Sequence, residues 1–132
     1  MRSAEELVEL GRRARDAGRV EEALGFYVRA VEAFEGEGNG VRAEHSRRHV
    51  ADLERELGRL EDARRDIGMV IAFYREHGAG TLEMGNTLRI AALVETAAGR
   101  VEEARGYWVE TLAMYEEVGV ATGVDECRRR LE

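Results

Sequence analysis

The side chains best suited to chemistry in this sequence are arginines that recur at a fixed interval. Arg48, Arg89 and Arg130 lie 41 residues apart. Guanidinium groups bind carboxylates and phosphates in bidentate fashion, so a surface that repeats them could bind an acidic peptide. The alternative is that these arginines pair with carboxylates of the same chain, such as Asp52 and Glu56, and cover the contacts between repeats. Exposed pairs of that kind contribute only about 0–1 kcal/mol each.

Two histidines form the next candidate site. His45 and His49 are four residues apart on one predicted helix, a spacing that can place both rings on one metal ion. Asp52 follows three residues later, but no third ligand is evident. The favoured interpretation is therefore a pair of surface histidines, whose loss of charge near neutral pH could tune the binding of an acidic ligand.

Cys127 is the single cysteine, which excludes an internal disulfide. It stands beside Arg128, Arg129 and Arg130, which would lower the pKa of its thiol if it were exposed. A buried position against the last repeat is the favoured alternative. The sequence contains no phosphate-binding glycine loop and no Ser/His/Asp arrangement that can be argued. It therefore predicts no catalytic residue, no cofactor and no metal site, and a protein that is not an enzyme.

Composition limits the class of protein. The chain of 132 residues has 44% hydrophobic and 36% charged residues and no proline, which predicts one mostly helical domain, residues 1–132. Its net charge of -7 argues against general nucleic-acid binding. All 20 basic residues are arginine, which we interpret as the codon bias of a bacterial, GC-rich genome. With no apolar run of about 18 residues and no signal peptide, we expect a cytoplasmic protein without membrane partners.

The elements that must position these side chains follow from a phrase that occurs three times. Gly18–Ala23, Gly58–Ala63 and Gly99–Ala104 share the pattern Gly-Arg-(Val/Leu)-Glu-(Glu/Asp)-Ala, and their starts are 40 and 41 residues apart. A period of this size is typical of helical repeat arrays. Apolar residues at helical spacing and glycine-containing turns predict antiparallel helix hairpins. The predicted helices begin near Ser3, which forms a capping box with Glu6, and near Val20, and then span about 41–57, 60–77, 81–98, 101–118 and 121–132.

The repeated residues resemble the tetratricopeptide repeat. The matching positions in the first repeat are Leu7, Leu10, Gly11, Ala14, Gly18, Ala23, Tyr27 and Ala30. The later repeats keep the turn glycine and the alanine after it, replace the Leu-Gly pair by Val50-Ala51 and Ala91-Ala92, and lack the family's proline. The period exceeds the usual value of about 34 residues. It is similar to the long-period form of kinesin light chains and bacterial regulatory proteins.

This resemblance implies an all-α fold, a right-handed α-α superhelix of three hairpins at about residues 3–38, 41–78 and 81–119 with a capping helix at about 121–132. It also implies a protein–protein interaction module in which the first helix of each hairpin lines a concave groove for a protein or peptide. Six arginines would then line this groove and bind an acidic partner: Arg12, Arg15, Arg48, Arg55, Arg89 and Arg130. All eight aromatic residues fall on second helices, so charge and hydrogen bonds would provide recognition in the groove.

Two alternative functions stay open at this point. One is a structural homo-oligomer, for example a homodimer, that assembles through exposed repeat faces. The other is the peptide-sensing part of a bacterial regulatory system. Tyr27 and Trp108 occupy predicted core positions, whereas Phe26 and Tyr107 lie one residue away from that face and could mark a surface for self-association.

Overall fold

The computed structural model describes residues 1–132 as seven α-helices without a β-strand. The helices are α1 (Ala4–Asp16), α2 (Val20–Gly36), α3 (Gly40–Glu56), α4 (Leu60–His77), α5 (Thr81–Ala97), α6 (Val101–Val118) and α7 (Ala121–Leu131). The predicted all-α class is confirmed, and every predicted helix is present with nearly the expected ends. No helix combines the length and the apolar character that crossing a membrane requires.

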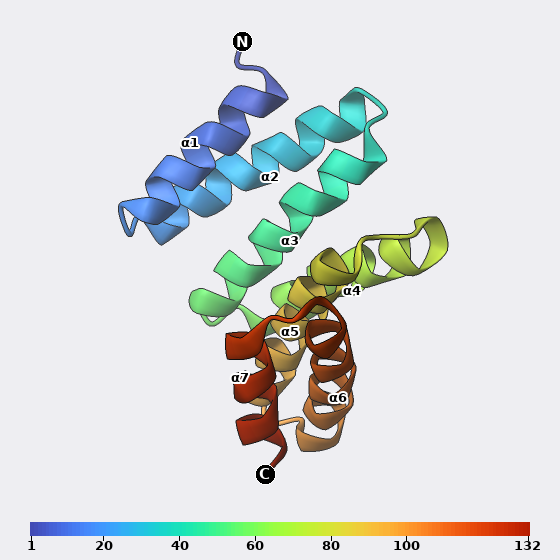
Figure 1. Ribbon diagram of the computed structural model, residues 1–132. Helices are drawn as coiled ribbons and strands as arrows, with labels where there is room; N and C mark the ends of the chain where they lie inside the picture. The colour runs from blue at the N-terminus through green and yellow to red at the C-terminus, as the bar shows by residue number, and fades with distance from the viewer. The chain divides into compact units, whose positions relative to one another are not determined.

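The chain divides into two compact units, Met1–Val70 and Ile71–Glu132. The boundary falls inside α4, so the first unit contains α1–α3 and the beginning of α4, and the second contains the end of α4 and α5–α7 (Figure 1). We refer to α1, α3, α5 and α7 as the first helices and to α2, α4 and α6 as the second helices. The predicted single domain and right-handed superhelix stay predictions.

The first unit is built on the hairpin of α1 and α2, which lie side by side, and on the packing of α3 against α2 (Figure 1). Its helix start is as predicted: Ser3 Oγ accepts a hydrogen bond from the Glu6 N–H at 3.1 Å, and Glu6 Oε1 accepts one from the Ser3 N–H at 3.3 Å. Phe26 is half-buried and packs on this core instead of standing exposed. The core residues are Ala14, Ala23, Leu24, Tyr27, Val31, Val50 and Leu53, with Ala4, Leu7, Ala30, Phe34 and Ala43 beside them.

The second unit packs α6 between α5 and α7. Trp108 and Tyr115 of α6 are buried with Cys127 of α7, and Tyr107 is half-buried against the same cluster. Trp108 Nε1 donates a hydrogen bond to Thr96 Oγ1 at 3.1 Å, so its polar atom is satisfied inside the core. Cys127 is fully buried, and burial raises the pKa of its thiol. The predicted buried position of Cys127 is therefore confirmed.

The repeated phrase forms a turn followed by a helix start. Gly18, Gly58 and Gly99 have φ angles of 77°, 78° and 74°, which lie in the left-handed region that favours glycine. The alanines five residues later, Ala23 and its repeat equivalents, are almost completely buried. Acidic residues such as Glu21 lie in the first turn of the helix, where negative charge stabilises the helix dipole. All three copies of the phrase are therefore scaffold.

Two other glycines allow helices to approach an aromatic ring closely. A Cβ atom on Gly11 of α1 would lie 2.8 Å from Cε2 of Tyr27, and one on Gly123 of α7 would lie 2.4 Å from Cδ2 of Tyr115. Both distances are too short for a side chain without displacement of the ring. Gly11 belongs to the Leu-Gly pair of the first repeat, so its packing explains why that position is small. Gly123 was not recognised in the sequence.

Candidate functional site

The six predicted arginines all lie on first helices, four in the first unit and two in the second. They are Arg12 and Arg15 on α1, Arg48 and Arg55 on α3, Arg89 on α5 and Arg130 on α7. The structure brings Arg15 and Arg55 together but leaves Arg12 and Arg48 outside their ion pairs. Whether the six bind a partner stays a prediction, and their surroundings differ strongly.

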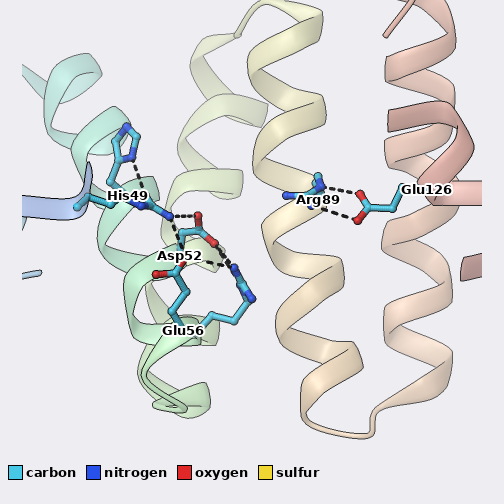
Figure 2. Close-up of polar contacts among 7 residues, drawn as sticks. His49, Asp52, Glu56, Arg89 and Glu126 are labelled. Atoms are coloured by element: carbon cyan, nitrogen blue, oxygen red, sulfur yellow. Dashed lines mark hydrogen bonds and ion pairs between the residues drawn. The ribbon is translucent and has the colours of Figure 1, made fainter. Parts of the chain in front are cut away.

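Arg15 and Arg55 converge on one carboxylate of α3. Arg15 Nη2 lies 2.5 Å from Asp52 Oδ2 and 3.3 Å from Glu56 Oε1. Arg55 Nη2 donates to the other oxygen, Asp52 Oδ1, at 2.8 Å. Figure 2 shows these contacts around the labelled Asp52 and Glu56. The internal pairing that the sequence left open is therefore present for these two arginines, and it ties α1 to α3.

The pairing sets the charge states within this cluster. Burial favours a higher pKa for Asp52, but the hydrogen bonds and positive charges of Arg15 and Arg55 outweigh burial, so the pKa is lowered. Burial also favours a lower pKa for Arg15, and the hydrogen bond and charge of Asp52 reverse that effect and raise it. Asp52 therefore stays ionised and holds two guanidinium groups in fixed positions.

Asp52→Asn should lower the free energy of unfolding by about 1.5–3 kcal/mol at neutral pH, because it removes hydrogen bonds to charged groups. The pKa of Asp52 is lower in the folded protein than in the unfolded chain, so its stabilising effect is present above the unfolded pKa and is lost in acid. Urea unfolding from neutral pH downward should show the difference shrinking below about pH 4. Asp16→Asn is the control, because Asp16 is exposed and has no ion pair, and it should change little.

His49 completes the cluster as a neutral residue. Its ring stacks on Tyr27 with a centroid distance of 4.7 Å and lies 5.4 Å from the ring of His45. Burial, followed by the charges of Arg48, His45 and Arg15, lowers the pKa of His49 to about 4. The expectation that this ring loses its charge near neutral pH is therefore wrong, because the ring is already neutral there. No group of three or more His, Cys, Asp or Glu side chains is arranged to hold a metal ion.

Arg48 differs from its neighbours because no carboxylate pairs with it. Its Nη1 is buried and has no hydrogen-bond partner, and an unsatisfied buried donor costs about 1–3 kcal/mol. Arg12 is exposed and pairs only with Glu9 one turn away, at 2.8 Å, a contact of little energetic weight. Among the four predicted arginines of the first unit, Arg48 and Arg12 are therefore the ones whose charge is least compensated within the protein.

In the second unit, Arg89 is held by a bidentate contact to Glu126 of α7. Arg89 Nε lies 2.6 Å from Glu126 Oε1 and Nη2 lies 3.1 Å from Oε2 (Figure 2). This hydrogen bonding is the main reason that the pKa of Glu126 is lowered. Arg130 lies over the ring of Trp108, with Cζ 5.3 Å from the ring centroid. Arg130 thus makes a cation–π contact within its own unit.

Sequence reasoning missed Glu126, although a signal was available. Arg15 and Asp52 are 37 residues apart, and so are Arg89 and Glu126. An acidic residue at this separation from an arginine therefore marks a pair between consecutive first helices of one unit.

Comparison with models of protein families found no match, and comparison with curated protein sequences found none either.

Proposed function

We propose that this protein is a non-catalytic protein–protein interaction module of the tetratricopeptide type, in which stacked hairpins form a right-handed superhelix. Three features support this proposal: the threefold phrase, helices of matching position in each repeat, and the close contact of Gly11 with Tyr27 at the family's Leu-Gly position. The proposed ligand is an acidic segment of a partner protein. It binds to the face that α1 and α3 form in the first unit.

The observation that carries the proposal is the uncompensated charge of Arg48. Of the four predicted arginines on α1 and α3, three pair with a carboxylate: Arg12 with Glu9, and Arg15 and Arg55 with Asp52. Arg48 has no such partner. His49 is neutral, so it adds no charge at neutral pH. Arg48 therefore offers a cation without an internal carboxylate partner, in a protein whose net charge is -7.

The paired residues have a supporting role in this proposal. Asp52 already pairs with Arg15 and Arg55, so these two guanidinium groups would lose less entropy when a ligand binds beside them. All eight aromatic residues lie on α2, α4 and α6, so the first helices offer no aromatic anchor. Binding would depend on guanidinium–carboxylate contacts and would weaken as salt screens them.

Reversing the charge of Arg48 tests this proposal. The probe is a fluorescein-labelled peptide of alternating glutamate and serine, and fluorescence anisotropy at low salt measures its Kd. Arg48→Glu should weaken binding by about tenfold or more, equivalent to at least about 1.4 kcal/mol. Arg29→Glu makes the same change of charge at an exposed, unpaired arginine of α2 and should have a much smaller effect.

The two variants separate specific binding from general attraction. Equal weakening by Arg48→Glu and Arg29→Glu would show that only net charge matters, which would contradict a binding face on α1 and α3. Circular dichroism of both variants must show unchanged helix content before their Kd values are compared.

A further inference from the structure

A second charged cluster in the first unit involves two carboxyl groups buried next to each other. Glu54 of α3 and Asp66 of α4 are each only 7% exposed, and both line the same cleft. Two carboxyl groups close together in a buried site are unfavourable when both are ionised. Burial, followed by the hydrogen bond and the charge of Asp66, raises the pKa of Glu54 to about 8. Glu54 is therefore protonated at neutral pH.

Glu54 and Asp66 line a cleft of about 240 Å³ among α2, α3 and α4. Its apolar wall consists of Val28, Val31 and Val50, and its other acidic residues are Glu32 and Glu35. This volume is below the roughly 300–1,000 Å³ of typical small-molecule sites, so the cleft suits a single side chain better than a large ligand. Apolar groups on one side and carboxyl groups on the other match an alkyl stem that ends in a cation.

The arginines that border the cleft do not satisfy Glu54. Arg47 donates to Glu35 at 2.8 Å and to Glu44 at 3.1 Å. Arg65 is largely exposed and donates to Asp62 at 3.3 Å. Each of them comes only within 3.8 Å of an Asp66 oxygen. Glu54 Oε1 is left buried without a hydrogen-bond partner.

This orphaned oxygen is the observation that points to a ligand. A buried acceptor without a donor is unfavourable, and it lies in the lining of a cleft with more acidic than basic groups. The lining contains four carboxyl groups and two guanidinium groups, so it has two excess negative charges when all are ionised and one while Glu54 keeps its proton. A positively charged hydrogen-bond donor would supply the missing hydrogen bond to Glu54 Oε1 and would also neutralise the excess negative charge of the cleft.

We propose that this cleft binds an arginine or lysine side chain of a partner protein, with the stem against the three valines and the cationic end donating to Glu54 Oε1. The site is separate from the face around Arg48 and takes a ligand of opposite charge. It therefore does not depend on the acidic ligand proposed above.

Binding of a cation here is coupled to release of a proton. The charged groups that share the cleft with Glu54 or act on it are Glu32 and Glu35 from α2, Arg47 from its own helix, and Asp62, Arg65 and Asp66 from α4. A cation beside Oε1 favours the ionised carboxylate, so the proton leaves to solvent when the ligand binds. Affinity should therefore increase as the pH rises from about 6 to about 8.

The test is an NMR titration of the full chain with N-acetyl-arginine amide, following the methyl resonances of the valines. Saturable shifts at Val28, Val31 and Val50 are expected, with tighter binding at pH 8 than at pH 6. N-acetyl-norleucine amide has an uncharged side chain and should cause no comparable shifts. Equal shifts with this neutral amide would overturn the proposal, and so would reproduction of the shifts by sodium or magnesium ions alone.

Two substitutions complete the test. Glu54→Gln should weaken binding of the arginine amide about tenfold or more and abolish its dependence on pH, whereas Glu37→Gln, at an exposed residue outside the cleft, should preserve both. Undiminished binding by Glu54→Gln would contradict the site. Arg48→Glu should leave this titration unchanged, so a failure here is distinguishable from a failure of the acidic-peptide proposal.

Discussion

Replacing Gly123 by alanine should lower the free energy of unfolding by about 1–3 kcal/mol, the usual cost of overpacking a core. The ring of Tyr115 lies between two glycines, and a Cβ atom on Gly123 would lie 2.4 Å from it and one on Gly85 would lie 3.0 Å from it. The ring cannot easily move aside, because Tyr115 is buried and its hydroxyl donates to Asn86 Oδ1 at 2.7 Å. Urea unfolding monitored by circular dichroism measures the change.

Gly106→Ala is the matched control for this substitution. Gly106 lies in the interior of α6 in the same unit, and a Cβ atom there would meet nothing within 4 Å. Alanine has the higher helix propensity, so this variant should gain about 0.5–1 kcal/mol. If Gly123→Ala also gained stability, α7 would not pack against Tyr115 as closely as described.

Glu54→Gln should make the protein more stable at alkaline pH, although it removes a charged residue. The pKa of a glutamate without neighbours is 4.5, and the pKa of Glu54 in the folded protein is about 8. Between these two pH values the folded state keeps a proton that the unfolded state has lost. The free energy of unfolding of the wild type therefore falls as the pH rises through this interval. Glutamine is neutral at every pH and avoids this loss, while its amide can still donate to Asp66.

The size of the effect follows from the displacement of the pKa. At about 1.4 kcal/mol per unit, the advantage of Glu54→Gln over the wild type should grow by on the order of 2–4 kcal/mol between pH 4.5 and pH 8. Other titrating groups are the same in both proteins, so their contributions cancel in the difference. Guanidinium chloride unfolding at several pH values measures it.

Glu44→Gln is the control for this second prediction. Glu44 lies on the same helix and is as buried as Glu54, but Arg47 Nε donates to it at 3.1 Å. Removing its charge leaves Arg47 with one fewer partner, so this variant should lose stability instead of gaining it. A difference between Glu54→Gln and the wild type that does not vary with pH would show that Glu54 shares no proton in the folded state.

The sequence was sufficient to locate the helices because each repeat gives the same local signals. Gly18 and its repeat equivalents mark the turns, the buried alanines follow at a constant distance, and Ser3 with Glu6 marks the first helix start. These signals depend on residues close together in the chain. The structure shows each of them where local conformational preferences require it.

The partners of the charged side chains could not be derived in the same way. Arg15 and Asp52, or Glu54 and Asp66, meet only after helices have packed, and many arginines and carboxylates were equally available. Repeat position places Arg48 and Arg89 at equivalent sites, yet Arg89 has Glu126 and Arg48 has no carboxylate. Equivalent repeat positions therefore need not have equivalent ion pairs. Arg48 is the candidate for ligand binding because it lacks the carboxylate partner that Arg89 has.

The most direct test of the proposed function is the NMR signal of the Nε–Hε group of Arg48, recorded during titration with the glutamate–serine peptide. The proposal predicts a saturable shift of this signal and smaller shifts for the Nε–Hε groups of Arg15 and Arg55, which already pair with Asp52. It also predicts that backbone amides of α1 and α3 shift more than those of α2. An unchanged Arg48 signal at saturating peptide would contradict the account.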